Sequence, residues 1–229
     1  MTPQSIMIFA AGRGTRMGAL TETRPKPLIT VAGRALIDHA LDLTDAIGPL
    51  TRVVNTHYLA PMIETHLSGR GVLFSPEPDL LLETGGGLRQ ALPLLGKNPV
   101  FTMNSDAIWR GPNPLNLLAD AWDPARMEAL LLLLPPAAAI GHTGAGDFRI
   151  DGNGRLTRGP GSVYSGAQII RTDTLAAVPH QVFSLNLVWD QMAARGGLFG
   201  LTYPGAWCDV GRPESIALAT ALLERTDVS

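Results

Sequence analysis

The sequence predicts an α/β fold: a Rossmann-like, mostly parallel sheet with helices on both faces and inserted β elements. In the first half, short apolar runs of strand length alternate with segments of helical periodicity. In the second half the pattern is less regular and includes closely spaced strand-like runs, which predicts β elements inserted over one end of the sheet. No repeat, low-complexity tract or linker divides the 229 residues, so we expect a single domain over 1–229.

The first half supplies the alternating elements. Short apolar runs predict strands at residues 6–9, 52–55, 71–75 and 100–103. Helical spacing of apolar residues predicts helices at 35–47, 61–67 and 87–95. In open α/β sheets, ligands bind outside the carboxyl ends of the strands. We therefore expect a site near the residues that follow Phe9, Ser75, Met103 and Leu134.

The second half continues the sheet and adds the inserted elements. A helix is predicted at 112–121 and a buried strand at 128–134. Residues 148–150 and 155–157 flank Asp151-Gly152-Asn153-Gly154, which predicts a hairpin with a glycine turn. Two further helices are predicted at 184–195 and at 212–225, the second with Pro213 in its first turn.

Composition excludes several classes of protein. Hydrophobic residues make up 45% of the chain and charged residues 17%, which is typical of a folded domain and not of a disordered one. The net charge is −2 without a basic cluster, so we expect neither a nucleic-acid nor a membrane partner. Cys208 is the single cysteine, which fits a reducing compartment. The first apolar stretch lacks a preceding basic region, which favours a buried strand over a signal peptide and a cytoplasmic location.

A glycine-rich loop follows the first predicted strand, with the sequence Ala10-Ala11-Gly12-Arg13-Gly14-Thr15-Arg16. Small residues let backbone N–H groups approach phosphate oxygens, and arginines add charge-assisted contacts. A dinucleotide fingerprint would need glycine where Met17 stands, and the Gly-Lys-Ser/Thr of a Walker loop is missing. From these residues alone, a phosphate-binding loop and a structural turn are both open.

Lys26 lies between two prolines in Arg24-Pro25-Lys26-Pro27-Leu28. Proline fixes its own φ and favours an extended conformation in the preceding residue. The lysine is therefore presented from a stiff backbone, which suits a point charge aimed at a phosphate. The alternative is a surface lysine in a proline-rich loop.

The combined spacing of these motifs with Leu20-Thr21 and Val31-Ala32-Gly33 resembles the signature of the sugar-1-phosphate nucleotidyltransferases, over roughly the first 35 residues. One departure is Ala19, preceded by Gly18, where the family usually has a proline before Leu-Thr. The resemblance implies the nucleotide-diphospho-sugar transferase fold and catalytic roles for Arg16 and Lys26. It implies nucleotide binding by Ala11, Gly12, Arg13, Gly14 and Thr15.

The resemblance extends to Glu83-Thr84-Gly85-Gly86-Gly87, a segment that lines the nucleobase in the family. It implies that Thr84, Gly85 and Gly86 bind the nucleotide. The glycines precede the helix predicted at 87–95 and could present backbone to a flat group. A flexible loop with Thr84 as helix cap is the alternative.

Two aspartates are candidate metal ligands. Asp106 follows the strand predicted at 100–103, and Asp209 lies in the apolar Trp207-Cys208-Asp209-Val210-Gly211. A buried carboxylate needs a partner, and magnesium is held by one or two carboxylates plus substrate phosphates. The resemblance implies that Asp106 and Asp209 bind Mg²⁺. Ser105 replaces the usual glycine of the family, and Cys208 is interpreted as a small buried residue without a base partner.

Gly146, Ser165 and Gly166 lie where the family shapes its sugar pocket, although ordinary turn and strand chemistry also explains them. With Trp207–Gly211 and Glu83–Gly87, these segments most resemble a bacterial subgroup that uses UTP and N-acetylmuramate α-1-phosphate in cell-wall recycling. The subgroup releases pyrophosphate. Mannose- or other hexose- or heptose-1-phosphate nucleotidyltransferases and a non-catalytic nucleotide-sugar sensor are alternatives. We expect a monomer or homodimer without the hexapeptide-repeat domain of larger relatives.

Overall fold

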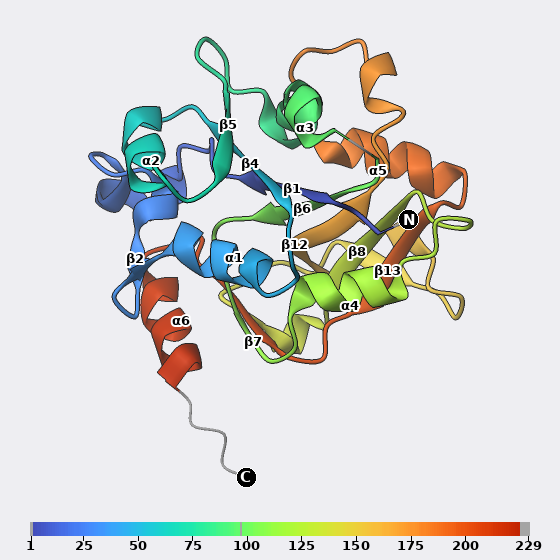
Figure 1. Cartoon of the computed structure of the whole chain (residues 1–229). Helices are drawn as coiled ribbons and strands as arrows, with labels where there is room; N and C mark the ends of the chain where they lie inside the picture. The colour runs from blue at the N-terminus through green and yellow to red at the C-terminus, as the bar shows by residue number, and fades with distance from the viewer. Residues whose placement is uncertain (1, 97, 225–229) are drawn as a thin grey trace.

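The computed structural model describes residues 2–96 and 98–224 (Figure 1). Within these residues, a seven-stranded sheet has the order β13-β8-β12-β6-β1-β4-β5. Its strands are β1 (Ser5–Phe9), β4 (Thr51–Thr56), β5 (Val72–Pro76), β6 (Val100–Asn104), β8 (Ala129–Leu134), β12 (Val163–Ile170) and β13 (Leu198–Thr202).

The sheet is mostly parallel, as predicted. Strands β5, β4, β1 and β6 pair in parallel, and so do β8 and β13, whereas β12 is antiparallel to both of its neighbours. The chain moves outward from β1 to β4 and β5 and then returns to β6 on the other side of β1. Such a change of direction opens a crevice between the carboxyl ends of β1 and β6, and ligands bind in such crevices of α/β sheets.

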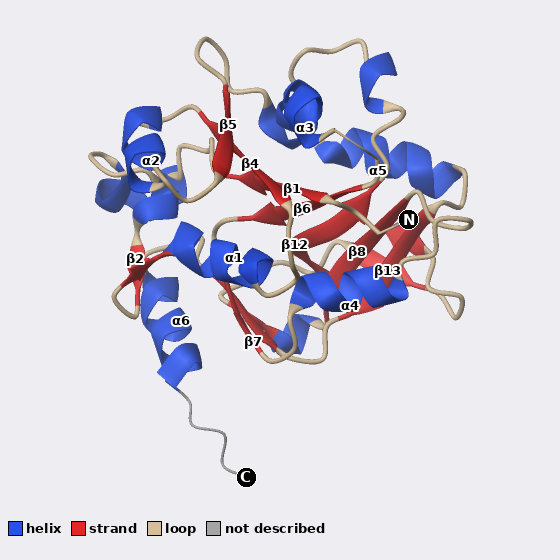
Figure 2. Cartoon of the chain, in the orientation of Figure 1, coloured by secondary structure: helices blue, strands red, loops and turns tan. Residues whose placement is uncertain are grey.

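Helices cover both faces of the sheet (Figure 2). Alternate residues of β1 point to opposite faces, so Ile6 and Ile8 join one hydrophobic core and Met7 joins the other. Helices α1 and α4 pack in the first core, and α3 and α5 pack in the second. The helices are α1 (Leu36–Asp45), α2 (Ala60–His66), α3 (Glu83–Leu95), α4 (Pro114–Ala121), α5 (Leu185–Ala194) and α6 (Glu214–Glu224).

The expected inserted elements are present. A small sheet has the order β7-β14-β9, with β7 (Ala107–Arg110), β14 (Ala206–Asp209) and β9 (Ala139–Ile140). The predicted hairpin is formed by β10 (Phe148–Ile150) and β11 (Leu156–Arg158). Short elements complete the chain: β2 (Thr30–Val31), β3 (Arg34–Ala35), η1 (Thr15–Thr21), η2 (Lys26–Leu28), η3 (Pro136–Ala138) and η4 (Leu175–Ala177).

Two predicted helix boundaries need correction. Helix α3 begins at Glu83, so the glycines predicted to precede it lie inside its first turns. These helical positions hold glycine because the helix packs closely there. A Cβ atom on Gly85 would lie 2.4 Å from the Phe183 ring, and one on Gly86 would lie 2.6 Å from the Gln181 carbonyl oxygen. Helix α6 begins at Glu214 and its predicted end at residue 225 lies outside the described residues.

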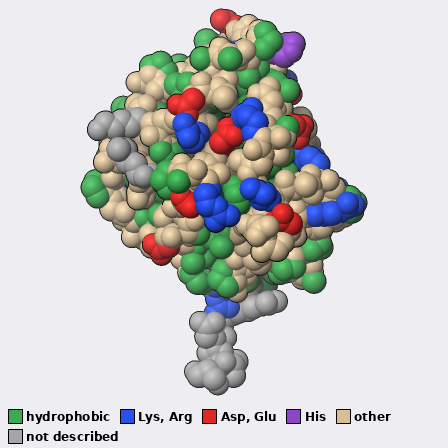
Figure 3. Space-filling model, turned by 90° about the vertical axis from the view of Figure 1, so that its right-hand side faces the viewer, with side chains coloured by type: hydrophobic (Ala, Val, Ile, Leu, Met, Phe, Trp, Pro, Cys, Tyr) green, Lys and Arg blue, Asp and Glu red, His purple; other side chains and the backbone are tan. Residues whose placement is uncertain are grey.

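The surface beside β13 and α5 carries acidic and basic side chains interspersed with one another (Figure 3). Ion pairs Arg158–Asp190, Arg171–Asp173 and Arg195–Glu128 join nearby segments. This face therefore has no large field of a single sign. Among the described helices, each is too short or too polar to span a bilayer.

Candidate active site

Two adjoining cavities open at the carboxyl ends of β1 and β6 and share Phe9, Gly12 and Asp106. The loop cavity is further lined by Ala10, Gly14, Thr15, Arg16, Lys26, Pro27, Ser105 and Gly211. The α3 cavity is further lined by Ala11, Asn55, Leu81, Glu83, Thr84 and Asn104. The crevice predicted from strand order is thus the place where the glycine-rich loop meets Asp106.

The glycine-rich loop packs directly against Lys26. Gly14 has φ of +63°, and a Cβ atom there would lie 2.7 Å from the Cβ of Lys26. Both the backbone conformation and the contact require glycine. The Thr21 hydroxyl donates to the carbonyl oxygens of Gly14 and Gly18, at 3.2 and 3.1 Å, and so holds the segment that differs from the family pattern.

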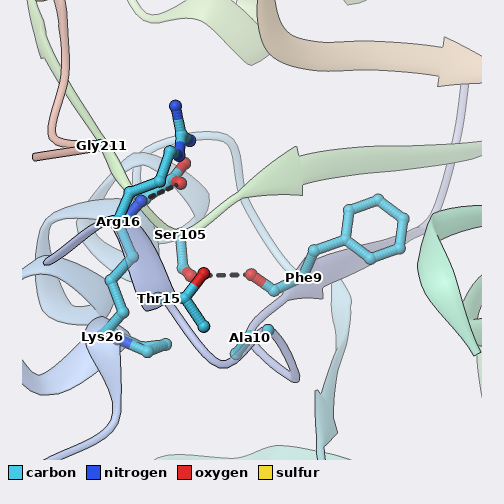
Figure 4. Close-up of a pocket in the computed structure, with 11 residues that line it drawn as sticks. Phe9, Ala10, Thr15, Arg16, Lys26, Ser105 and Gly211 are labelled. Carbon is cyan, nitrogen blue, oxygen red and sulfur yellow. Dashed lines mark hydrogen bonds and ion pairs between the residues drawn. The ribbon is translucent and has the colours of Figure 1, made fainter. Parts of the chain in front are cut away.

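Lys26 is buried, so its interpretation as a surface lysine is wrong. Its Nζ lies 2.6 Å from Oδ2 of Asp106, and the two side chains are 10% and 27% exposed. Pro25 is extended, with φ of −67° and ψ of 143°, and Lys26 opens the short helix η2. Figure 4 shows the side chains of Lys26 and Arg16 converging on the side of the loop cavity where Gly211 lies.

The small sheet brings the two predicted metal ligands together. In the pairing of β14 with β7, Asp209 lies opposite Ala107, and the Val210 N–H donates to the Asp106 carbonyl oxygen at 2.9 Å. Burial, and then the Asp106 carboxylate, raise the pKa of Asp209, while Lys26, Arg16 and His142 act in the opposite direction. The arrangement fits a divalent cation because a positive charge between the carboxylates would relieve their repulsion.

The donor set fits magnesium better than a site built wholly from protein. Among the described residues, no group of three or more His, Cys, Asp or Glu side chains converges to hold a metal ion. Two carboxylates leave most coordination positions to water and substrate phosphates, which is how Mg²⁺ is usually bound. Asp106 and Asp209 would therefore hold the ion only as a partial shell.

Gly211 explains how Arg16 approaches Asp209. A Cβ atom on Gly211 would lie 2.7 Å from Oδ2 of Asp209 and 3.2 Å from Nη2 of Arg16, so a side chain would displace both groups. Arg16 lines the loop cavity, whereas Arg13 lines a separate depression with Tyr58 on the other side of the loop.

Ser105 ties the two central strands together. Its hydroxyl donates to the Phe9 carbonyl oxygen at 2.7 Å, and its N–H lies 3.3 Å from the same atom (Figure 4). A glycine, usual in the family at this position, could make only the backbone contact. The serine therefore adds a link between the end of β1 and the residue that precedes Asp106.

A buried network behind the α3 cavity was missed by sequence reasoning. The Asn55 side chain accepts from the Ala10 N–H at 2.8 Å and donates to Oε1 of Glu77 at 2.7 Å. Oε2 of Glu77 accepts from the Leu82 N–H at 2.8 Å, and Glu77 is 1% exposed. The network joins the start of the glycine-rich loop to the start of α3. The signal available was position, since Asn55 and Glu77 lie at the carboxyl ends of β4 and β5.

The residues predicted to bind the base are placed differently from one another. Thr84 lines the α3 cavity, and its hydroxyl accepts from the Leu185 N–H at 3.0 Å instead of capping the helix. The N–H groups of Gly85 and Gly86 both donate to the Phe183 carbonyl oxygen, at 2.9 and 3.0 Å. These two glycines are buried in the packing of α3 and line neither cavity.

Of the three predicted sugar-side residues, Gly166 packs against a residue that lines the α3 cavity. Its φ is +91°, and a Cβ atom there would lie 2.9 Å from the side chain of Asn104 in the α3 cavity wall. The Ser165 hydroxyl is engaged with the Leu132 carbonyl oxygen at 2.7 Å. Gly146 packs on a neighbouring loop, and Ser165 and Gly146 line neither cavity.

Comparisons with known proteins agree with this geometry. Residues 6–134 match the MobA-like NTP transferase domain. The N-acetylmuramate alpha-1-phosphate uridylyltransferase of Caulobacter vibrioides is 40% identical over 235 residues, covering 96% of this chain and 97% of that protein. Its counterpart from Neisseria meningitidis is 35% identical, with coverages of 94% and 96%. HddC from Yersinia pseudotuberculosis, solved with GMP-PN, shares the fold with a TM-score of 0.76 at 20% identity, covering 98% of this chain and 100% of that one.

Proposed function

The chain belongs to the MobA-like NTP transferase family and is a sugar-1-phosphate nucleotidyltransferase, and on that premise we propose that it transfers the uridylyl group of UTP to N-acetylmuramate α-1-phosphate. Pyrophosphate is the second product. The choice of nucleotide and sugar rests on the two uridylyltransferases that align along nearly the whole chain. We place the reaction in the cytoplasm and in cell-wall recycling, the pathway of the subgroup that the sequence resembles.

The observation that carries the chemistry is the convergence of Lys26, Arg16 and two carboxylates beside the glycine-rich loop. An oxygen of the sugar phosphate attacks the α-phosphorus of UTP, a new P–O bond forms, and the bond to the β-phosphate oxygen breaks. The attacking oxygen is already anionic at neutral pH. The residues therefore need to position two anions and neutralise their charge, and no general base is required.

Each group has a place in that task. Lys26 is paired with Asp106 and donates to the transferring phosphate, and Arg16 lines the same cavity and donates to the triphosphate. Backbone N–H groups of the loop at 11–15 face the phosphates. Mg²⁺ held by Asp106 and Asp209 supplies further charge neutralisation at the α-phosphate when it is bound.

The test is pyrophosphate release with Mg²⁺, crossing UTP, CTP, GTP, ATP and dTTP with the 1-phosphates of N-acetylmuramic acid, N-acetylglucosamine, glucose and mannose. Turnover with UTP and the muramic acid phosphate at least tenfold above every other pair supports the proposal. A different preferred pair replaces the substrates and keeps the chemistry. No turnover by a folded, nucleotide-binding sample refutes the catalytic assignment.

A further inference from the structure

Glu83 combines a strained backbone with a place in the wall of the α3 cavity. Its φ is +61°, in the left-handed region that residues other than glycine rarely adopt, and it lines the cavity beside Leu81 and Thr84. We propose that the Glu83 carboxylate selects the nucleobase by accepting a hydrogen bond from the N3–H of uracil. The inference rests on the proposed use of UTP and adds the residue that recognises it.

The backbone on both sides of Glu83 explains why its conformation is strained. The Leu82 N–H is held by Glu77 at 2.8 Å, and the Leu82 carbonyl oxygen accepts from the Phe183 N–H at 3.2 Å. Two residues later, the Gly85 N–H donates back to the Phe183 carbonyl oxygen at 2.9 Å. The intervening residue has to turn through the left-handed region, where glycine would be free of strain. A glutamate at such a position points to a use for its side chain.

The carboxylate is available for a ligand. Glu83 is exposed, and within residues 2–96 and 98–224 its side chain makes no hydrogen bond or ion pair. By contrast, Asn55 is engaged with Ala10 and Glu77, and Asp106 is paired with Lys26. Glu83 is thus the free acidic acceptor of the α3 cavity.

Charge sets the orientation of the nucleotide. Lys26 and Arg16 line the loop cavity, so the phosphates belong there, and a free carboxylate repels them from the α3 cavity. The base then lies beside Glu83 and the apolar side chain of Leu81. Uracil has one N–H donor, at N3, and a carboxylate can only accept. Placed at that position, the carboxylate meets a lone pair on N3 of cytosine and repels it.

The test measures the binding of UTP, CTP and N3-methyl-UTP by calorimetry with Mg²⁺ and without sugar phosphate. Wild type is expected to favour UTP over both analogues. In Glu83→Gln and Glu83→Gly the preference should fall by roughly 10- to 100-fold, the range expected when a hydrogen bond to a charged group is lost. Gln can present an N–H donor, so Glu83→Gln should also bind CTP more tightly than wild type.

A matched control separates strain from recognition. Ala32 has φ of +48° and is exposed away from both cavities, so Ala32→Gly relieves similar strain without touching the site. Both glycine variants should keep or raise the Tm, and only Glu83→Gly should lose base preference. A large fall in the Tm of Glu83→Gly would overturn the inference, because the side chain would then serve the fold.

Two other results would overturn it. Equal losses for UTP and CTP in the Glu83 variants would mean that the carboxylate contacts the ribose or another common group. An unchanged preference for UTP over CTP, with unchanged affinities, would mean that the Glu83 carboxylate contacts neither the base nor the ribose. Because sugar phosphate is omitted, the absence of turnover with the muramic acid phosphate would leave this test intact and would count only against the proposed function.

Discussion

Replacing Lys26 by methionine tests the central assignment, because it removes the positive charge and keeps most of the side-chain volume. In the proposed mechanism the lysine donates to the transferring phosphate, and Asp106 accepts a hydrogen bond from it at 2.6 Å. Removing one preorganised donor from a site of developing charge lowers kcat by roughly 10²- to 10³-fold. The KM for UTP should change less, because in the proposed mechanism Arg16 and the loop N–H groups still bind the triphosphate.

The same change should lower stability in a metal-dependent way. At 2.6 Å and an effective dielectric constant of about 20, the gross attraction between Lys26 and Asp106 is about 6 kcal/mol. Desolvation of the amine offsets most of this, and Asp106 is 27% exposed, so we expect a net loss of about 1–2 kcal/mol. For a chain of this length that corresponds to a Tm lower by roughly 2–8 °C. Mg²⁺ should restore more stability in the variant than in wild type, because Asp106 and Asp209 then repel each other without the lysine.

The measurements are steady-state kinetics with both substrates and thermal denaturation with and without Mg²⁺. Arg34→Met is the matched control, since it removes a cation paired with Asp42 on the surface, where both side chains are largely exposed. It should leave kcat unchanged and shift the Tm by no more than roughly 2–4 °C, because an exposed pair contributes at most about 1 kcal/mol. A Lys26→Met enzyme with normal kcat and a raised KM would refute the reasoning, because the lysine would then contribute only to binding.

Three further predictions concern buried groups. Asp209→Asn should raise the Tm of metal-free protein at pH 7 and remove the stabilisation by Mg²⁺ in thermal denaturation. The raised pKa of Asp209 means that the folded state favours the protonated carboxyl group. The stability that this protonation contributes is present below the ordinary pKa of aspartate and is lost as the pH rises through the pKa of the folded state. Glu77→Gln should lower the free energy of unfolding by about 1–3 kcal/mol and weaken UTP binding in calorimetry. The carboxylate accepts from Asn55 and Leu82, and the glutamine amide would turn an N–H donor toward one of them. An unchanged Tm and an unchanged affinity for UTP would contradict this role. Burial raises the pKa of Cys208 to about 11, so about one thiol in 1,000 is ionised at pH 8. Labelling of Cys208 by iodoacetamide, followed by mass spectrometry, should therefore be slow until urea is added. Rapid labelling of the folded protein would show that the thiol is accessible.

Strand β8 could be predicted because its side chains are apolar on both faces. Residues 129–134 are six consecutive apolar residues because β8 is buried on both sides. Strand β12 was not predicted, because Gln168 interrupts its apolar pattern. Its amide donates to the Thr102 hydroxyl at 3.0 Å and accepts from the Trp189 N–H at 2.9 Å. Those partners come from other elements, and local sequence does not reveal them.

The candidate site also contains residues that local sequence predicts and residues whose role depends on distant contacts. Lys26 and Asp106 could be predicted because strand ends and proline restraint are local features. The glycines of α3 were interpreted as a surface for the base, but Gly85 packs against Phe183 and Gly86 against the Gln181 carbonyl oxygen, each nearly 100 residues away. Where a glycine is required by a close neighbour, sequence alone does not say whether that neighbour is a ligand or the protein itself.

The pairing of β7 with β14 has a consequence for how the enzyme matures. About 100 residues separate Asp106 from Asp209, so the second carboxylate joins the first only after a long loop has closed, which is a slow kind of contact to form. On the ribosome, the glycine-rich loop and β6 emerge well before β14. A nascent chain therefore contains the residues of the proposed phosphate site before it contains Asp209, and the proposed pair of metal-binding carboxylates is complete only late in synthesis.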